Sequence, residues 1–186
     1  MKLFHTTTLA TLFLLTATAV SQAVDPPMLP TPEKEHAWLQ QLVGEWNTEV
    51  EMIPEPGQPA IKCKGTESVR AIGPFWIQAE STMNVMDLKI IGLLTVGYDA
   101  DGKKYVGTWI DSVSGYHWKY DGQIDKEGKK LTLNTEGPCP YAPGKNSKFK
   151  EVIEIKSKNE KVFTSSVQGD DGKWTTMLTI TAKRKN

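Results

Sequence analysis

The sequence has no excess of charge of either sign. Its 186 residues include 22 Lys and Arg and 22 Asp and Glu, so the formal net charge is zero. A chain without a net field has no long-range attraction for nucleic acid or for an anionic membrane surface. The basic end Lys183-Arg184-Lys185 is short and typical of a solvated terminus. We therefore expect no nucleic acid among the partners of this protein.

Histidine and cysteine are scarce, with three and two residues respectively. They form no Ser-His-Asp, Cys-His or zinc-ligand spacing, so the sequence does not name a reaction. Whether the chain is an enzyme stays open at this point. Cys63 and Cys139 could form a disulfide in an exported chain. Sequence alone does not fix the distance that the bond requires, so bonded and free thiols both remain open.

The N-terminus has the pattern of an export signal. Residues 1–23 carry one formal charge, at Lys2, and residues 9–20 are small and apolar. Ser21-Gln22-Ala23 fits a small-x-small cleavage site, so residues 1–23 are predicted to be a secretory signal peptide. A membrane anchor is the alternative, but the many Thr residues make the run too weakly apolar for it. The mature chain is then periplasmic or secreted, with no stable membrane span.

The mature chain begins with a proline-rich segment and a short helix. Four prolines within residues 24–32 predict a stiff, extended leader. Residues 33–186 have the length of one domain. Thr31 is a candidate N-cap for a helix that begins near Pro32, and this helix is expected to cover one end of a sheet. His36, near the helix start, is predicted to lie at the surface.

The rest of the chain consists of ten short runs in which apolar and polar residues alternate. Such runs are typical of strands with one buried face, and acid–glycine pairs such as Glu127-Gly128 and Asp171-Gly172 are typical of the hairpins between them. The expected fold is all-β: an antiparallel up-and-down meander closed into a barrel, which removes its exposed edges. A two-sheet sandwich is the competing arrangement. The expected strands cover residues 45–53, 60–72, 75–85, 89–98, 103–111, 115–124, 130–136, 148–156, 161–168 and 174–181.

The alternation gathers aromatic and aliphatic side chains on one inner face. Ten strands enclose more room than a barrel of about eight, which already holds one small ligand. The interior is therefore either a filled core or a pocket lined by flat apolar surfaces, and both remain open. The aromatic residues predicted to face inward are Trp46, Phe75, Trp109, Tyr116, Trp118, Tyr120, Phe149 and Trp174.

Glu67 and Glu151 share the inner face, and no Lys or Arg is predicted to join them. A lone buried carboxylate is costly unless it is hydrogen-bonded or protonated, although either Glu could instead reach solvent at a rim. An interior of this kind favours a small apolar ligand that is neutral or cationic. One alternative is an enzyme that uses the two carboxylates as acid and base. Another is a structural or partner-binding domain with a filled core.

The order of short motifs resembles that of a known family. The segments follow one another as in the bacterial DUF1579 family, a domain of unknown function, over nearly the whole mature chain. The resemblance implies a calycin-like barrel and no established activity. Glu67, Trp109 and Glu136 match its motif positions and are the first candidates for a site. The matching segments are Gly44-Glu45-Trp46, Gly65-Thr66-Glu67, Gly97-Tyr98-Asp99, Gly107-Thr108-Trp109-Ile110, Thr135-Glu136-Gly137-Pro138 and Gly169-Asp170-Asp171-Gly172-Lys173-Trp174.

The opening Gly44-x-Trp46 after a short helix is also similar to that of lipocalins, fatty-acid-binding proteins and nitrobindin-like proteins. The haem-binding nitrobindins imply a barrel with an internal His on iron. Here His117 lies on the strand face opposite Tyr116 and Trp118. We therefore expect no haem and no other cofactor.

Overall fold

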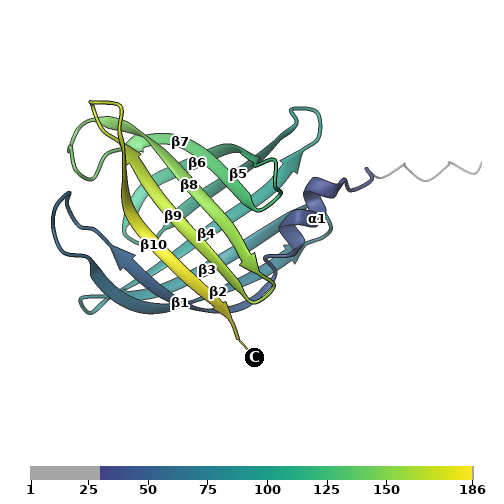
Figure 1. The fold of residues 1–186 in the computed structure, drawn as a ribbon, viewed down its shortest axis with the longest axis horizontal. Coiled ribbons are helices and arrows are strands. Elements are labelled where there is room, and N and C mark those ends of the chain that lie inside the picture. The colour runs from purple at the N-terminus through teal and green to yellow at the C-terminus, as the bar shows by residue number, and fades with distance from the viewer. Residues whose placement is uncertain (1–29, 186) are drawn as a thin grey trace, which may run out of the picture. The chain divides into compact units, whose positions relative to one another are not determined.

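The computed structural model describes residues 30–185, which form a closed barrel of ten antiparallel strands and one short helix. Each strand pairs with its neighbours in the chain, and β10 pairs with β1 to close the sheet (Figure 1). The expected fold class is confirmed, and the sandwich is excluded. The elements are α1 (Lys34–Gln40), β1 (Gly44–Met52), β2 (Ile61–Ile72), β3 (Trp76–Val85), β4 (Leu88–Asp99), β5 (Lys104–Asp111), β6 (Ser114–Ile124), β7 (Lys130–Pro138), β8 (Asn146–Ser157), β9 (Glu160–Gln168) and β10 (Trp174–Arg184).

The predicted signal peptide lies outside the described residues, as does the predicted leader apart from residues 30–32. Across the described range, no helix combines the length and the apolarity that crossing a membrane requires.

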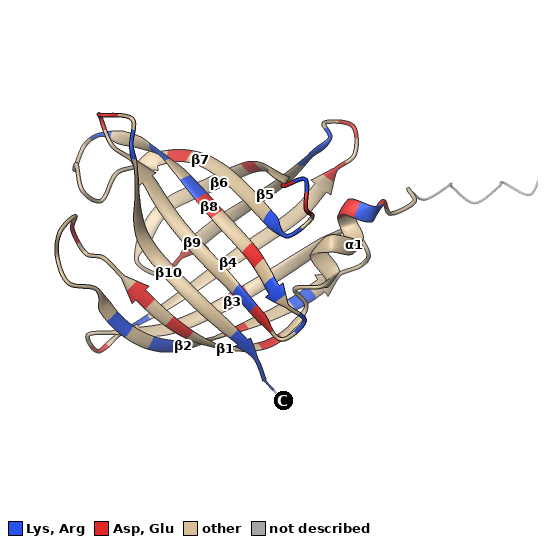
Figure 2. Cartoon of the chain, in the orientation of Figure 1, with Lys and Arg blue, Asp and Glu red and all other residues tan. Residues whose placement is uncertain are grey.

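Successive side chains along each strand point alternately into the barrel and out of it, and this alternation decides which residues face the interior. In β1 the side chains of Trp46, Thr48 and Val50 are buried, while the residues between them are exposed. Strand β4 is apolar on both faces, and the register places Ile90 and Leu94 against the interior. The exposed positions carry most of the charge, and Figure 2 shows acidic and basic residues interspersed along the strands and turns.

Trp46 closes the floor of the barrel. Its indole N–H donates to the carbonyl of Leu42, 3.0 Å away, just before β1 begins. The guanidinium of Arg184 lies 4.1 Å from the centroid of the indole ring, and the ammonium of Lys161 lies 4.8 Å from it. Arg184 also donates to the carbonyl of Val43 at 2.6 Å. Arg184 of β10 thus fixes both the backbone that leads into β1 and the indole ring of Trp46 that closes this end of the barrel.

The helix α1 differs from the prediction at its first turn. Glu33, not Thr31, is the N-cap residue, and its backbone N–H donates to Nδ1 of His36 at 2.9 Å. The prediction that His36 lies at the surface is wrong, because its ring packs edge-on against Phe75 and Tyr98. The physical reason is that α1 packs against β3 and β4 with this side of the helix inward.

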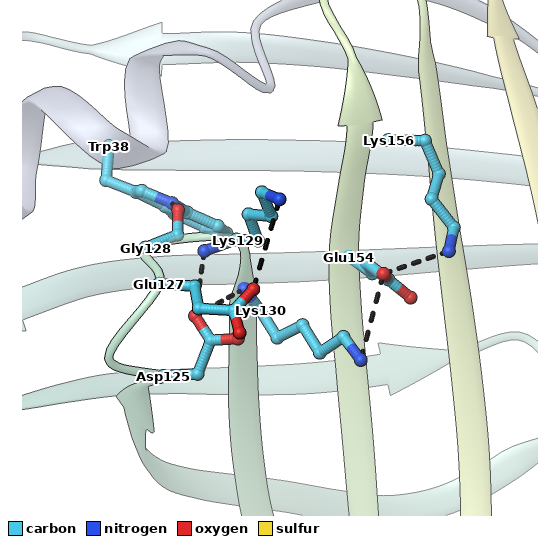
Figure 3. Close-up of polar contacts among 8 residues, drawn as sticks. All are labelled: Trp38, Asp125, Glu127, Gly128, Lys129, Lys130, Glu154 and Lys156. Carbon is cyan, nitrogen blue, oxygen red and sulfur yellow. Dashed lines mark hydrogen bonds and ion pairs between the residues drawn. The ribbon is translucent and has the colours of Figure 1, made fainter.

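A single hydrogen bond joins α1 to the turn between β6 and β7 (Figure 3). Trp38 donates its indole N–H to the carbonyl of Gly128 at 2.7 Å. Asp125 shapes that turn, since its carboxylate accepts the backbone N–H groups of Lys129 at 2.8 Å and Lys130 at 3.1 Å. These backbone hydrogen bonds, that of Lys130 foremost, hold the pKa of Asp125 below its usual range. These hydrogen bonds thereby fix the turn at the place where Trp38 of α1 binds it.

Beside the same turn, Glu154 on the outer wall is the partner of two lysines (Figure 3). Its carboxylate lies 2.9 Å from the ammonium of Lys156 and 3.7 Å from that of Lys130. Both lysines are well exposed, so solvent screens these pairs and they add little to stability.

Replacing Trp38 with Phe removes the bond to Gly128 and part of a buried ring. We expect the free energy of unfolding to fall by about 1–2 kcal/mol, measured by urea denaturation. Trp174→Phe is the matched control: this ring is 40% exposed, so its replacement should change stability by less than about 0.5 kcal/mol. Equal costs at the two positions would contradict the anchoring of α1 by Trp38.

Candidate functional site

The barrel encloses a cavity of about 490 Å³ toward the end that lies away from α1. Its wall is mainly apolar and includes Leu94, Phe163 and Ile180 from β4, β9 and β10. Side chains therefore do not fill the interior, and of the two arrangements that the sequence left open, a filled core and a pocket, the barrel has the pocket. Five of the predicted site residues line the cavity: Glu67, Trp109, Trp118, Tyr120 and Glu151.

Two glycines let aromatic rings lie flat on the cavity wall. The ring of Trp109 lies over Gly92, and the ring of Trp118 lies over Gly137, so close that a Cβ at either glycine would overlap it. Trp109 donates its indole N–H to Oδ2 of Asp111 at 2.9 Å, which leaves the rest of the ring as an apolar surface. Any larger residue at these glycines would push the rings into the cavity.

Glu67 meets a cation that the sequence did not predict. Lys161 of β9 faces inward and places its ammonium 2.5 Å from the Glu67 carboxylate. The expectation that no Lys or Arg faces the interior is therefore wrong. Both side chains are largely shielded from solvent, with 9% of Lys161 and 17% of Glu67 exposed. In such surroundings each charge depends on the other for compensation.

Glu151 is the buried acid of the site, and it has no cationic partner. Its Oε1 accepts a hydrogen bond from Oγ of Ser165 at 3.0 Å, across the β8–β9 ladder. Its Oε2 is buried and has no hydrogen-bond partner. Burial raises the pKa of Glu151 to about 8, while the bond from Ser165 opposes that shift. The rim alternative is thus excluded for Glu151, and the carboxyl group is mainly protonated at neutral pH.

Tyr120 and Asp111 are two further polar residues on the cavity wall. Burial raises the pKa of Tyr120 well above its usual range, and the nearby carboxyl groups of Glu151 and Asp111 raise it further. The Tyr120 phenol therefore stays a neutral O–H group across the physiological range. Asp111 and Ser165 are site residues that sequence reasoning missed, because Asp111 ends a strand and Ser165 is a small side chain without a distinctive signal.

Trp174 is not part of the cavity, and the prediction that it faces inward is wrong. The β9–β10 pairing shifts register between Thr176 and Leu178, so one extra residue inverts the alternation there. Leu178 and Ile180 line the cavity. Trp174 lies outside instead, and the ammonium of Lys150 sits 4.4 Å from the centroid of its ring.

Three further candidates also lie outside the cavity wall. Glu136, chosen from the family resemblance, is exposed on the outer face of β7. Tyr116 is 37% exposed; its phenol donates to the backbone carbonyl of Glu136 at 3.2 Å, and its ring meets that of Trp118 edge-on. Trp46 belongs to the floor beneath the ion pair. His117 is exposed, as predicted from its strand face.

Both thiols are free, and they occupy different parts of the barrel. Cys63 lies on β2 opposite Val50, and burial raises the pKa of its thiol. Cys139 follows β7 and is buried with Phe149 and Val167 near the cavity wall. Within residues 30–185, no three His, Cys, Asp or Glu side chains are grouped as metal ligands.

The sequence match decides the family. The family model DUF1579, described as a protein of unknown function, matches residues 31–184. This chain belongs to the DUF1579 family. The match confirms the resemblance in the motif order and covers α1 and all ten strands of the barrel.

Solved structures resemble this DUF1579 barrel in fold. Rv2717c from M. tuberculosis has a TM-score of 0.57 and 10% identity, over 83% of this chain and 99% of that one. The S-type phycobiliprotein lyase CPES from Guillardia theta has a TM-score of 0.54 and 13% identity, over 83% of this chain and 99% of that one. Identities this low establish a shared barrel fold alone. No curated protein matches the sequence.

Replacing Glu151 with Gln should change how the stability of the DUF1579 barrel depends on pH. The folded state keeps the Glu151 proton up to a pKa of about 8, whereas the ordinary pKa of a glutamate side chain is 4.5. Between these values the unfolded chain has lost a proton that the folded chain retains. The wild type should therefore lose stability relative to Glu151→Gln as pH rises, by up to about 1.4 kcal/mol per unit. Urea denaturation over this range measures it, and parallel curves would contradict the burial of Glu151.

Lys161→Met should destabilise the same barrel by about 3 kcal/mol, because it leaves Glu67 shielded from solvent without its partner. The double variant Glu67→Gln/Lys161→Met removes both charges and should regain most of that loss. Urea denaturation of the wild type, both single variants and the double variant forms a complete cycle. A double variant whose loss of stability equals the sum of the losses of the two single variants would show that the pair is not coupled.

Proposed function

We propose that this DUF1579 protein is an exported barrel that binds a small, mainly apolar molecule, neutral or cationic, in its interior. The observation that carries the proposal is the cavity of about 490 Å³, apolar except for a few polar groups. Its volume falls within the range usual for sites of small ligands. The unpartnered Oε2 of Glu151 supports the proposal, because buried polar atoms in proteins nearly always have a hydrogen-bond partner.

The charges inside the barrel favour a neutral or cationic ligand over an anionic one. Lys161 is the cation on the cavity wall, and its ammonium is engaged by Glu67 at 2.5 Å. An anionic head group would have to displace that carboxylate or meet Glu151 and Asp111 without compensation. The enzyme alternative would use Glu67 and Glu151 together, but Glu67 is engaged by Lys161 and is therefore not a free base.

One part of the cavity rim offers an apolar approach. The β3–β4 turn exposes Met86 by 81% and Leu88 by 54%, and Val113 in the β5–β6 turn is 54% exposed. By contrast, the segment between β7 and β8 is tied to the loop after β1, because the phenol O–H of Tyr141 donates to the carbonyl of Ile53 at 2.6 Å. Entry of an apolar molecule is therefore favoured between the β3–β4 and β5–β6 turns.

A cavity-filling substitution tests the proposal. Diphenylhexatriene is a neutral hydrocarbon that fluoresces in apolar surroundings, and it should bind the mature protein with one-to-one stoichiometry. Ile180→Trp places an indole in the cavity and should weaken binding at least about tenfold in a fluorescence titration.

Thr179→Trp is the matched control, because Thr179 precedes Ile180 on β10 and faces the outside of the barrel. Its affinity for the hydrocarbon should equal that of the wild type. Absence of binding by the wild type, or equal binding by both Trp variants, would reject the interior as a ligand site.

A further inference from the structure

The buried end of Glu151 lies in apolar surroundings on the cavity wall. Its neighbours on the same face of β8 are Phe149 and Ile153, and its partner across the ladder on β7 is Leu133. Ser165 on β9 reaches only Oε1. Oε2 is therefore the one atom of this carboxyl group that no residue in the described part of the chain satisfies.

No positive charge is available to hold Glu151 ionised. The other titratable side chains on the cavity wall are Glu67 of β2, Asp111 of β5, Tyr120 of β6, Cys139 after β7 and Lys161 of β9. Lys161 is the one cation among these residues, and its ammonium forms an ion pair with Glu67. Along β9, Lys161 lies four residues before Ser165, which corresponds to about 13 Å of strand. A carboxyl group so placed is stabilised as the neutral acid.

We propose that Glu151 presents its Oε2–H as a hydrogen-bond donor when its carboxyl group turns toward the cavity that it lines, and that the site takes neutral apolar molecules bearing a carbonyl oxygen. With Ser165 donating to Oε1, the carboxyl proton belongs on Oε2, where it has no acceptor in the protein. Carboxylic acids kept neutral by apolar surroundings donate hydrogen bonds in this way in other protein sites. The inference rests on the proposed function, since it names the class of ligand for the same cavity.

Two neutral probes of similar size separate this inference from the proposed function. Prodan is an apolar naphthalene ketone whose emission moves to longer wavelength when its carbonyl accepts a hydrogen bond. Diphenylhexatriene has no hydrogen-bonding group. The pKa of Glu151 is raised to about 8 by burial, so raising the pH from about 7 to about 9 ionises the acid and removes the donor. The affinity for prodan, relative to the hydrocarbon, should fall about tenfold across this range.

Glu151→Gln is the matched variant, because its amide also donates a hydrogen bond but does not titrate. In this variant the preference for prodan should persist and should no longer depend on pH. Glu151→Leu removes the donor and should lower the preference about tenfold at neutral pH. If the Leu variant fails to fold, the pH series on the wild type and the Gln variant tests the inference by itself.

The outcomes are distinct. Binding of the hydrocarbon without a pH-dependent preference for prodan would reject the role of Glu151 and leave the proposed function standing. A trimethylammonium derivative of diphenylhexatriene that binds more tightly than the neutral hydrocarbon already at about pH 6 would also reject it, because Glu151 would then be an ionised carboxylate that holds a cation where the inference requires a neutral acid. Failure of both neutral probes to bind would reject the proposed function itself.

Discussion

The pairing of β1 with β10 is the constraint on which the rest of the barrel depends. It sets Trp46 opposite Arg184, whose guanidinium covers the indole ring and binds the carbonyls that precede β1. It also brings Lys161 of β9 against Glu67 of β2, although β10 and β1 lie between these strands in the sheet. An open sheet would separate these partners and leave two unpaired edges.

The two ends of the barrel follow from this closure in different ways. At the end nearer α1, the core contains Trp38, Trp46 and Tyr105, so this end is filled. Toward the other end, ten strands enclose more width than the inward side chains occupy, and the cavity remains. The ion pair at the floor satisfies its own charges, whereas Glu151 higher on the wall keeps an unsatisfied oxygen. We propose that the apolar wall and this unsatisfied oxygen together recognise the ligand.

Alternation along the chain predicted the strands and the inner faces of β1, β2 and β3, because these strands keep one period from end to end. It failed at Trp174, where a register shift in β10 inverts the faces and no residue type marks the position. The alternation did not predict that Lys161 faces inward. Lys161 lies next to the tight turn before β9, where the pattern does not show which residues belong to the inner face. Glu136 came from motif order, which carries no information on side-chain direction. The cavity depends on summed side-chain volumes, which a periodic pattern does not report.

A crystal structure under xenon pressure tests the central claim, a hollow apolar interior, most directly. Xenon occupies empty apolar cavities without requiring any specific chemical group. A hollow interior should show xenon density inside the barrel, in contact with Leu94, Phe163 and Ile180. A barrel whose side chains meet across this space, with no xenon between them, would contradict it.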